Sequence, residues 1–125
     1  MMLTKEEQAV LRHYIIISIA RKALEKDLFL LEKTPLKLQG TYLELVRKTL
    51  EQISKEMALI KRYMKLHQMK IEKQESDGFF STYAYWCRGY EGVNRILNTH
   101  LKQQVTNYLM RFFTFEKSRL SQLDG

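Results

Sequence analysis

The chain has 125 residues, and its 21 Lys and Arg residues outnumber its 14 Asp and Glu residues, which gives a formal net charge of +7. A single domain over residues 1–125 is the natural expectation at this length. Cys87 is the only cysteine, which excludes a disulfide framework and favours a reducing, cytoplasmic location. The ordinary balance of 45% hydrophobic and 28% charged residues disfavours intrinsic disorder. The longest apolar stretch near the N-terminus covers residues 14–20, so no membrane span is expected.

The first expected element is a long helix over residues 4–33. Thr4 and Glu7 stand in the capping-box arrangement, in which a threonine side chain accepts from an early backbone N–H and a glutamate reaches back. Pro35 disfavours helical conformation at Thr34 and so ends the helix there. Apolar residues recur every seven positions and isoleucines broaden the stripe, so the middle of this helix is expected to be covered on most sides.

A second long helix is expected over residues 41–67, where Thr41 and Glu44 repeat the capping-box spacing. Its apolar residues are spaced alternately three and four residues apart, which indicates an apolar seam that packs against a long neighbouring helix. Because a short connector joins the two helices, they are predicted to pack antiparallel as a helical hairpin, with an intermolecular coiled coil as the alternative. The seam residues are Leu43, Val46, Leu50, Ile53, Met57, Ile60, Met64 and His67.

Residues 69–87 differ from the helical segments and predict a β-hairpin. Residues 69–74 alternate in polarity, Asp77 and Gly78 are a turn signal, and residues 79–87 are rich in aromatic side chains that favour strands. The competing interpretation is a helix over Phe80–Cys87. An isolated hairpin is only marginally stable in water, so this one is expected to lie on the helices.

A third helix is expected over residues 91–115, because Val93, Ile96, Leu97 and Leu101 begin a broad apolar face. The predicted fold class is therefore mainly α, with an α+β arrangement. It combines two long antiparallel helices, a β-hairpin at about residues 69–87 and a C-terminal helix, and the helices form a three-helix core.

Motifs for catalysis or cofactor binding are missing from the sequence. The His and Cys residues lack metal-ligand spacing, and neither a nucleophile motif nor a glycine-rich phosphate loop occurs. His67 and His100 extend apolar helical faces, which favours structural roles over metal ligation. Cys87 precedes Arg88, an arrangement that activates some thiols, but a small buried residue at a strand end is the favoured interpretation. We therefore expect a non-enzymatic protein without cofactor or metal.

Two groups of residues are candidates for binding a partner. Basic side chains concentrate on the second helix and attract polyanions such as nucleic acid, although helix solvation explains them more simply. Aromatic residues between positions 79 and 90 are typical of single-strand binding, although core packing explains them more simply. An arginine beside them can meet phosphate or carboxylate, or form a salt bridge to a glutamate of the first or second helix. The candidates are Lys61, Arg62, Lys65, Tyr83, Tyr85 and Arg88.

The leading functional hypothesis is a small interaction or regulatory protein, of a kind common in bacteria and their phages, that binds an unidentified protein partner. The alternative is an accessory protein that binds DNA or RNA through the basic helix face and the hairpin aromatics. A third hypothesis is peripheral membrane association through Phe112, Phe113 and Phe115 with Lys117 and Arg119. Self-association into a homo-oligomer through the seam or the aromatic tail is also compatible with the sequence.

Overall fold

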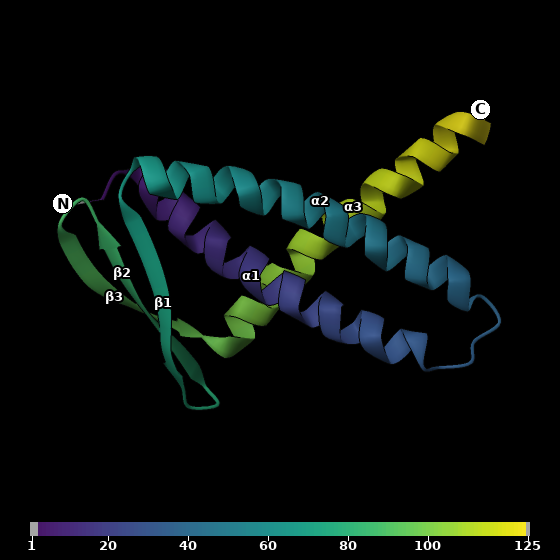
Figure 1. Ribbon diagram of the computed structural model, residues 1–125, viewed down its shortest axis with the longest axis horizontal. Helices are drawn as coiled ribbons and strands as arrows, with labels where there is room; N and C mark the ends of the chain where they lie inside the picture. The colour runs from purple at the N-terminus through teal and green to yellow at the C-terminus, as the bar shows by residue number, and fades with distance from the viewer. Residues whose placement is uncertain (1–2, 125) are drawn as a thin grey trace.

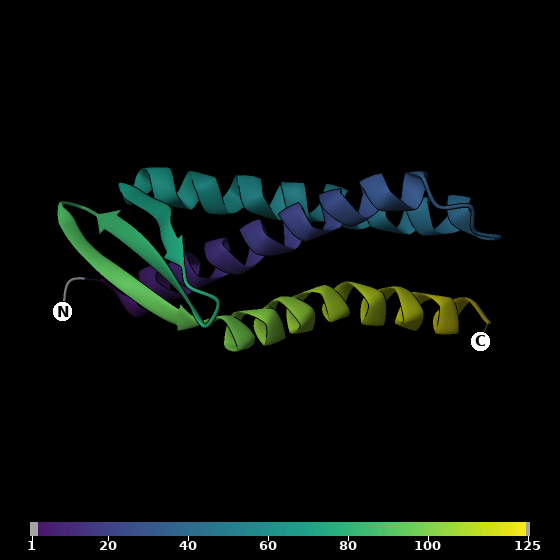
Figure 2. The ribbon, with the colours of Figure 1, turned by 90° about the horizontal axis from the view of Figure 1, so that it is seen from below.

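The chain folds into two long helices, a three-stranded antiparallel sheet and a C-terminal helix. The structure is a computed structural model that describes residues 3–124, with side chains described as far as Phe112. Helices α1 and α2 form an antiparallel hairpin, the sheet lies where α1 begins and α2 ends, and α3 crosses the hairpin as a second layer (Figure 1, Figure 2). The predicted fold class is confirmed. The elements are α1 (Lys5–Glu32), α2 (Gln39–Leu66), β1 (Met69–Ser76), β2 (Phe80–Cys87), β3 (Tyr90–Leu97) and α3 (Asn98–Asp124).

Helix α1 begins with the predicted capping box and lies at the centre of the fold. The backbone N of Glu7 donates to Thr4 Oγ1 at 3.0 Å, and the backbone N of Thr4 donates to Glu7 Oε1 at 2.9 Å. Leu11, Ile15 and Ile17 are almost inaccessible to solvent because α1 contacts both α2 and α3. The middle of α1 is therefore covered on most sides, as the isoleucine-rich sequence predicts.

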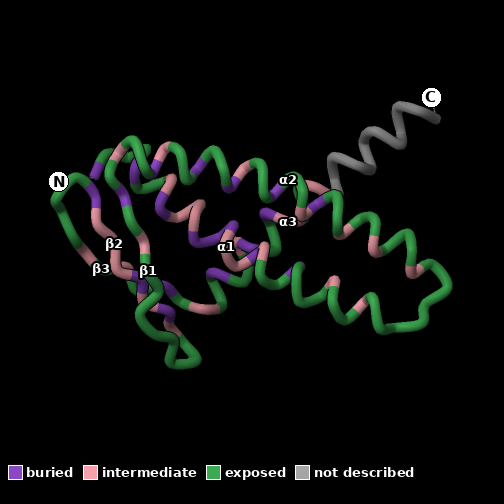
Figure 3. Tube along the Cα trace, in the orientation of Figure 1, coloured by how far each residue is buried: buried purple, intermediate pink, exposed green. Residues whose placement is uncertain are grey.

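The apolar seam of α2 packs inside the chain. Ile53, Met57, Ile60 and Met64 are buried, and α2 contacts α1 along the hairpin. Burial decreases toward the connection between the two helices, where the chain is exposed (Figure 3). The predicted antiparallel pairing of the two helices is therefore confirmed.

The predicted start of α2 at residue 41 is wrong, because the helix begins at Gln39 and Thr41 lies inside it. The residue before the helix, Leu38, provides no side-chain cap. The side-chain amide of Gln39 instead donates to the carbonyl oxygens of Leu31 and Glu32 at 2.8 and 3.2 Å. These carbonyls belong to the last turn of α1, where carbonyl groups have no donor within the helix. By binding them, Gln39 favours a start of α2 at residue 39 over a start at residue 41.

The predicted hairpin is present as β1 and β2, which pair antiparallel across the turn at Asp77. Asp77 Oδ1 accepts from the backbone N of Phe79 at 3.0 Å and of Phe80 at 2.7 Å. Gly78 adopts a φ of 92°, a left-handed conformation that favours glycine. The turn chemistry therefore fixes the hairpin where the sequence indicates it.

The predicted start of the third helix at residue 91 is also wrong, because residues 90–97 form a third strand and α3 begins at Asn98. Arg88 and Gly89 have φ values of 50° and 88°, so a two-residue turn folds β3 back onto β2. All eight residues of β3 pair with β2. Apolar residues at 93, 96 and 97 fit a helical period, but the pairing with β2 satisfies the backbone of this segment as a strand.

A polar junction connects the three helices near the middle of the fold. The Tyr108 hydroxyl of α3 donates to Glu56 Oε2 of α2 at 2.8 Å. The other carboxylate oxygen of Glu56 lies 2.6 Å from Nε2 of His13 in α1. The His13 and Tyr108 rings meet edge to face. This junction and the apolar seams together make the three-helix core.

Candidate functional site

A polar cluster lies where α1 begins, α2 ends and β2 turns into β3. Glu7 is only 1% exposed, and its two carboxylate oxygens accept from Arg88 Nε at 3.0 Å and Arg88 Nη2 at 2.8 Å. His67 Nδ1 and Cys87 Sγ lie 3.0 and 3.3 Å from Glu7 Oε2. The backbone N of Arg88 also donates to the carbonyl oxygen of Gln68. We call Glu7, His67, Cys87 and Arg88 the Glu7 cluster.

The Glu7 cluster keeps its carboxylate charged and its thiol protonated. The Arg88 hydrogen bonds, followed by the backbone N–H of Thr4, hold the pKa of Glu7 well below its usual range despite burial. Burial, followed by the hydrogen bond to Glu7, raises the pKa of the Cys87 thiol. A protonated and inaccessible thiol is a poor nucleophile, although Cys87 and His67 lie close together. The arrangement favours a structural role, in which the cluster fastens the sheet to the helices.

Two of the candidate binding residues, Tyr83 and Tyr85, face the interior of the fold, whereas the side chain of Arg88 is 41% exposed. Tyr83 is buried in the hydrophobic core, and Tyr85 packs against the same core from the inner side of β2. Arg88 is held by Glu7 of α1, which confirms the simpler interpretation, a salt bridge to a glutamate of the first or second helix. The hairpin therefore does not present these three side chains together to a partner.

The other candidates, Lys61, Arg62 and Lys65, are exposed on the last turns of α2. Their positive charge remains available to an anionic partner. The hypothesis of membrane association depends mainly on Phe113, Phe115 and the basic residues after them, whose side chains lie outside the described part of the chain.

The sheet presents one face to the helices and the other to solvent. Tyr83, Cys87 and Ile96 belong to the core on the inner face, and no element of the described chain covers the opposite face. On that face Val93 is 64% exposed and Leu97 is 46% exposed. We call this surface the outer sheet face, and its residues are Lys70, Glu72 and Glu75 of β1, Phe80, Thr82, Ala84 and Trp86 of β2, and Glu91, Val93, Arg95 and Leu97 of β3.

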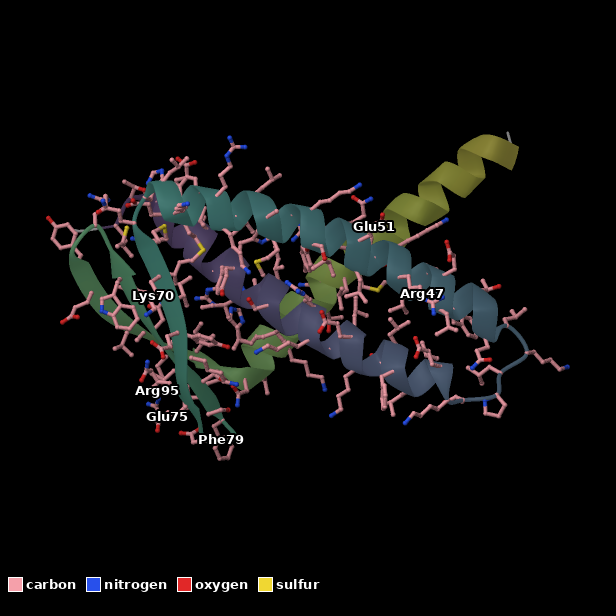
Figure 4. The ribbon with its side chains drawn as sticks, in the orientation of Figure 1. Arg47, Glu51, Lys70, Glu75, Phe79 and Arg95 are labelled. Carbon is pink, nitrogen blue, oxygen red and sulfur yellow. The ribbon has the colours of Figure 1, made fainter. Side chains whose placement is uncertain are left out.

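The two aromatic rings of the outer sheet face have charged side chains as neighbours. Lys70 Nζ lies 5.5 Å from the centre of the Trp86 ring, and Trp86 Nε1 donates to Glu91 Oε2 at 3.2 Å. The Arg95 guanidinium lies 3.9 Å from the centre of the Phe80 ring. Figure 4 shows Lys70 and Arg95 on the sheet, at the end of the molecule away from the helix connection. Both rings therefore have a charged side chain beside them on the same face.

The residues of the outer sheet face are not among the binding candidates that the sequence suggests. The strand alternation places Phe80 and Trp86 opposite Tyr83 and Tyr85, but alternation alone does not tell which face the helices cover. The apolar contribution of Val93 and Leu97 was also missed, because the helical interpretation assigned these residues to the core.

The match to a protein family covers most of the chain. The family model described as YhjD protein matches residues 2–117. The chain belongs to the YhjD protein family. The matched region contains the whole Glu7 cluster and the whole outer sheet face. No curated protein and no solved structure matches the chain.

An open groove of about 1080 Å³ lies between α2 and α3, and Glu44, Glu51, Arg111 and Phe112 contribute to its walls. Among the residues that the structure describes, no three His, Cys, Asp or Glu side chains are grouped to hold a metal ion. No helix in the same part of the chain is long and apolar enough to cross a membrane. The outer sheet face therefore remains the most distinctive surface.

Proposed function

We propose that the protein is a non-enzymatic interaction protein that binds a protein partner through the outer sheet face. The observation that carries this proposal is the exposure of Val93 and Leu97 on the face that also holds the rings of Trp86 and Phe80. Phe79, in the turn between β1 and β2, is also 77% exposed. Apolar side chains that gather on one uncovered face mark protein-binding surfaces, and tryptophan is a frequent anchor in them.

The buried cysteine supports a cytoplasmic location for this activity. Cys87 is a free thiol without solvent access, and proteins with unpaired cysteines are usual in reducing compartments. The charge of the outer sheet face further favours a protein over a nucleic acid, since Glu72, Glu75 and Glu91 outnumber Lys70 and Arg95. An anionic backbone would be repelled by this face.

The proposal is tested by in-cell photo-crosslinking. A photoreactive amino acid replaces Val93 on the outer sheet face, and a matched variant carries it at Leu59 of α2, where the native side chain is 66% exposed. We expect discrete crosslinked adducts from position 93 and none from position 59. Leu97→Asp should remove the adducts at position 93, whereas Leu66→Asp at the exposed end of α2 should not. Identical adducts from both crosslinking positions, or none from position 93, would overturn the proposal.

Nucleic-acid binding is the second candidate, and it depends on Lys61, Arg62 and Lys65 because all three are exposed on one segment of α2. Binding of labelled DNA and RNA is measured by fluorescence anisotropy over a range of salt concentrations. If the candidate is correct, affinity falls steeply with added salt and is lost when the three residues are changed to Glu. No anisotropy change at low salt would refute it.

A further inference from the structure

We propose that the partner of the outer sheet face is a second copy of the same chain, so that two sheets pack face to face in a homodimer. This inference rests on the proposed function, because it names the occupant of the same surface. The observation that supports it is the pattern of charges over the face, because the positive charges of one copy can lie opposite the negative charges of a second copy.

The strand register places the four outermost charges in two rows across the sheet. Lys70 of β1 pairs with Trp86, which pairs with Glu91 of β3. Glu75 of β1 pairs with Thr82, which pairs with Arg95 of β3. Each row therefore has one base and one acid at its ends, and the order reverses between the rows. All four side chains are exposed, and Figure 4 shows Arg95 and Glu75 near the hairpin turn with Lys70 further along β1.

A two-fold axis that runs parallel to the strands between two facing sheets matches this pattern. The axis stacks β2 on the partner's β2 and places β1 opposite the partner's β3, with strands aligned as in most sheet packings. Lys70 then lies opposite the partner's Glu91, and Arg95 lies opposite the partner's Glu75. Because each contact occurs twice by symmetry, the two copies form four oppositely charged pairs around the Phe80, Ala84 and Trp86 side chains of β2.

The other ways of stacking the two faces are less favourable. An axis across the strands pairs Lys70 with the partner's Glu75, but it also brings Glu72 against the partner's Glu72 at the middle of β1. A crossing at right angles places Lys70 opposite the partner's Arg95 and acids opposite acids. Like charges that face each other disfavour association. The positions of the charged side chains on the face therefore favour the two-fold axis parallel to the strands.

The size of the face indicates a reversible dimer. Strands of eight residues, with about 3.3 Å per residue and about 4.8 Å between strands, give a face of roughly 26 by 14 Å. That is smaller than the roughly 800 Å² per partner of a standard stable interface. We therefore expect dissociation in the micromolar range, with the monomer and the dimer both populated.

The experiment measures self-association of the full chain by sedimentation equilibrium and by the emission of Trp86, which is the only tryptophan. The expected mass rises above the 15.0 kDa of one chain as concentration increases, and Trp86 emission shifts to the blue because its ring becomes covered. K70E and E91K should each weaken dimerisation about tenfold, since each replaces two attractive pairs by two repulsive ones. The double variant K70E/E91K should restore the dimer.

The controls separate this packing from its alternatives and from loss of folding. K70E/E75K should not restore the dimer, and helix content measured by circular dichroism should be the same for all variants. Restoration by K70E/E75K in place of K70E/E91K, or failure of both, would overturn the proposed dimer. A chain that stays monomeric while position 93 crosslinks to other proteins would also overturn it and leave the proposed function standing. Monomeric behaviour without any crosslink at position 93 would overturn both.

Discussion

At the scale of single residues, Glu7 is an acidic side chain that is removed from water and remains ionised. Arg88 supplies two hydrogen bonds to its carboxylate, and His67 and Cys87 contact the same oxygen. Since the pKa of Glu7 is lowered in the folded chain, protonation opposes folding. The stability that Glu7 contributes is fully present above its unfolded pKa of about 4.3 and is lost as the pH falls toward the lower folded value.

The first prediction concerns the acid side of the stability profile. The free energy of unfolding, measured by urea denaturation at several pH values, should fall as the pH drops below about 4.3. Glu7→Gln should lower stability at neutral pH and flatten this dependence, because the titrating group is gone. Asp77→Asn is the control, since the backbone N–H groups of Phe80 and Phe79 also lower the pKa of Asp77 and this variant keeps the contribution of Glu7. An unchanged slope in Glu7→Gln would contradict the assignment.

The sequence predicted part of this residue-scale chemistry. The capping box predicts that Glu7 reaches back to Thr4. A glutamate of the first or second helix is the expected salt-bridge partner of Arg88. In the structure the Glu7 carboxylate contacts both Thr4 and Arg88. This happens because α1 packs against the β2–β3 turn, a tertiary contact for which the sequence has no local signal. Tyr83 and Tyr85 lie on the inner side of β2, which the sequence does not show because alternation defines two faces of a strand but not which one is covered. Their role in binding stays a prediction.

At the scale of elements, the seam of α2 is the part that the sequence predicted best. Ile53 is fully buried, whereas Leu59 on the same helix is 66% exposed. A spacing of three and four residues predicts this difference because it follows the helical period. Helix α2 therefore offers one buried and one exposed apolar side chain whose contributions to stability can be compared.

The second prediction compares truncations of these two side chains. Ile53→Ala should reduce the free energy of unfolding by about 2–5 kcal/mol, since it removes buried methyl groups and leaves a cavity. Leu59→Ala should change it by less than about 0.5 kcal/mol because the side chain lies in solvent. Chemical denaturation of both variants measures the difference. Equal losses would mean that the face of α2 that packs on α1 has been misidentified.

Strand β3 is the element that the sequence predicted wrongly. Its apolar residues fit both a helical and a strand period, and no local rule decides between them for a short segment. The pairing with β2 across the Arg88–Gly89 turn decides for the strand. Within this pair Gly92 lies beneath the Tyr85 side chain, and a Cβ atom at residue 92 would overlap the Tyr85 hydroxyl group. Gly40, near the start of α2, has open space around the same position.

The third prediction follows from this pair of glycines. Gly92→Ala should destabilise the protein by about 1–3 kcal/mol, because the added methyl group displaces Tyr85 from the core. Gly40→Ala should be neutral or stabilising by up to about 1 kcal/mol, since alanine is the better helix former. Thermal unfolding monitored by circular dichroism compares the two variants. A neutral Gly92→Ala would argue against the close packing of β2 and β3.

At the scale of the whole molecule, the sheet and the helices share one core. Tyr83, Cys87 and Ile96 from the strands belong to the same buried cluster as Ile15 and Ile17 of α1. The Glu7 cluster adds polar contacts between α1, the end of α2 and the β2–β3 turn. Because no separate core exists for the sheet among the described residues, the sheet and the helices should unfold together.

The last prediction tests this coupling with two probes. Trp86, the only tryptophan, lies on β2 and reports the sheet, whereas far-ultraviolet circular dichroism reports mainly the helices. Thermal transitions from the two probes should coincide, as they do when a domain unfolds in one step. Ile96→Ala, which truncates a buried side chain of β3, should lower both midpoints equally, by on the order of 10 °C. A fluorescence midpoint that falls while the circular dichroism midpoint stays in place would show that the sheet unfolds independently of the helices.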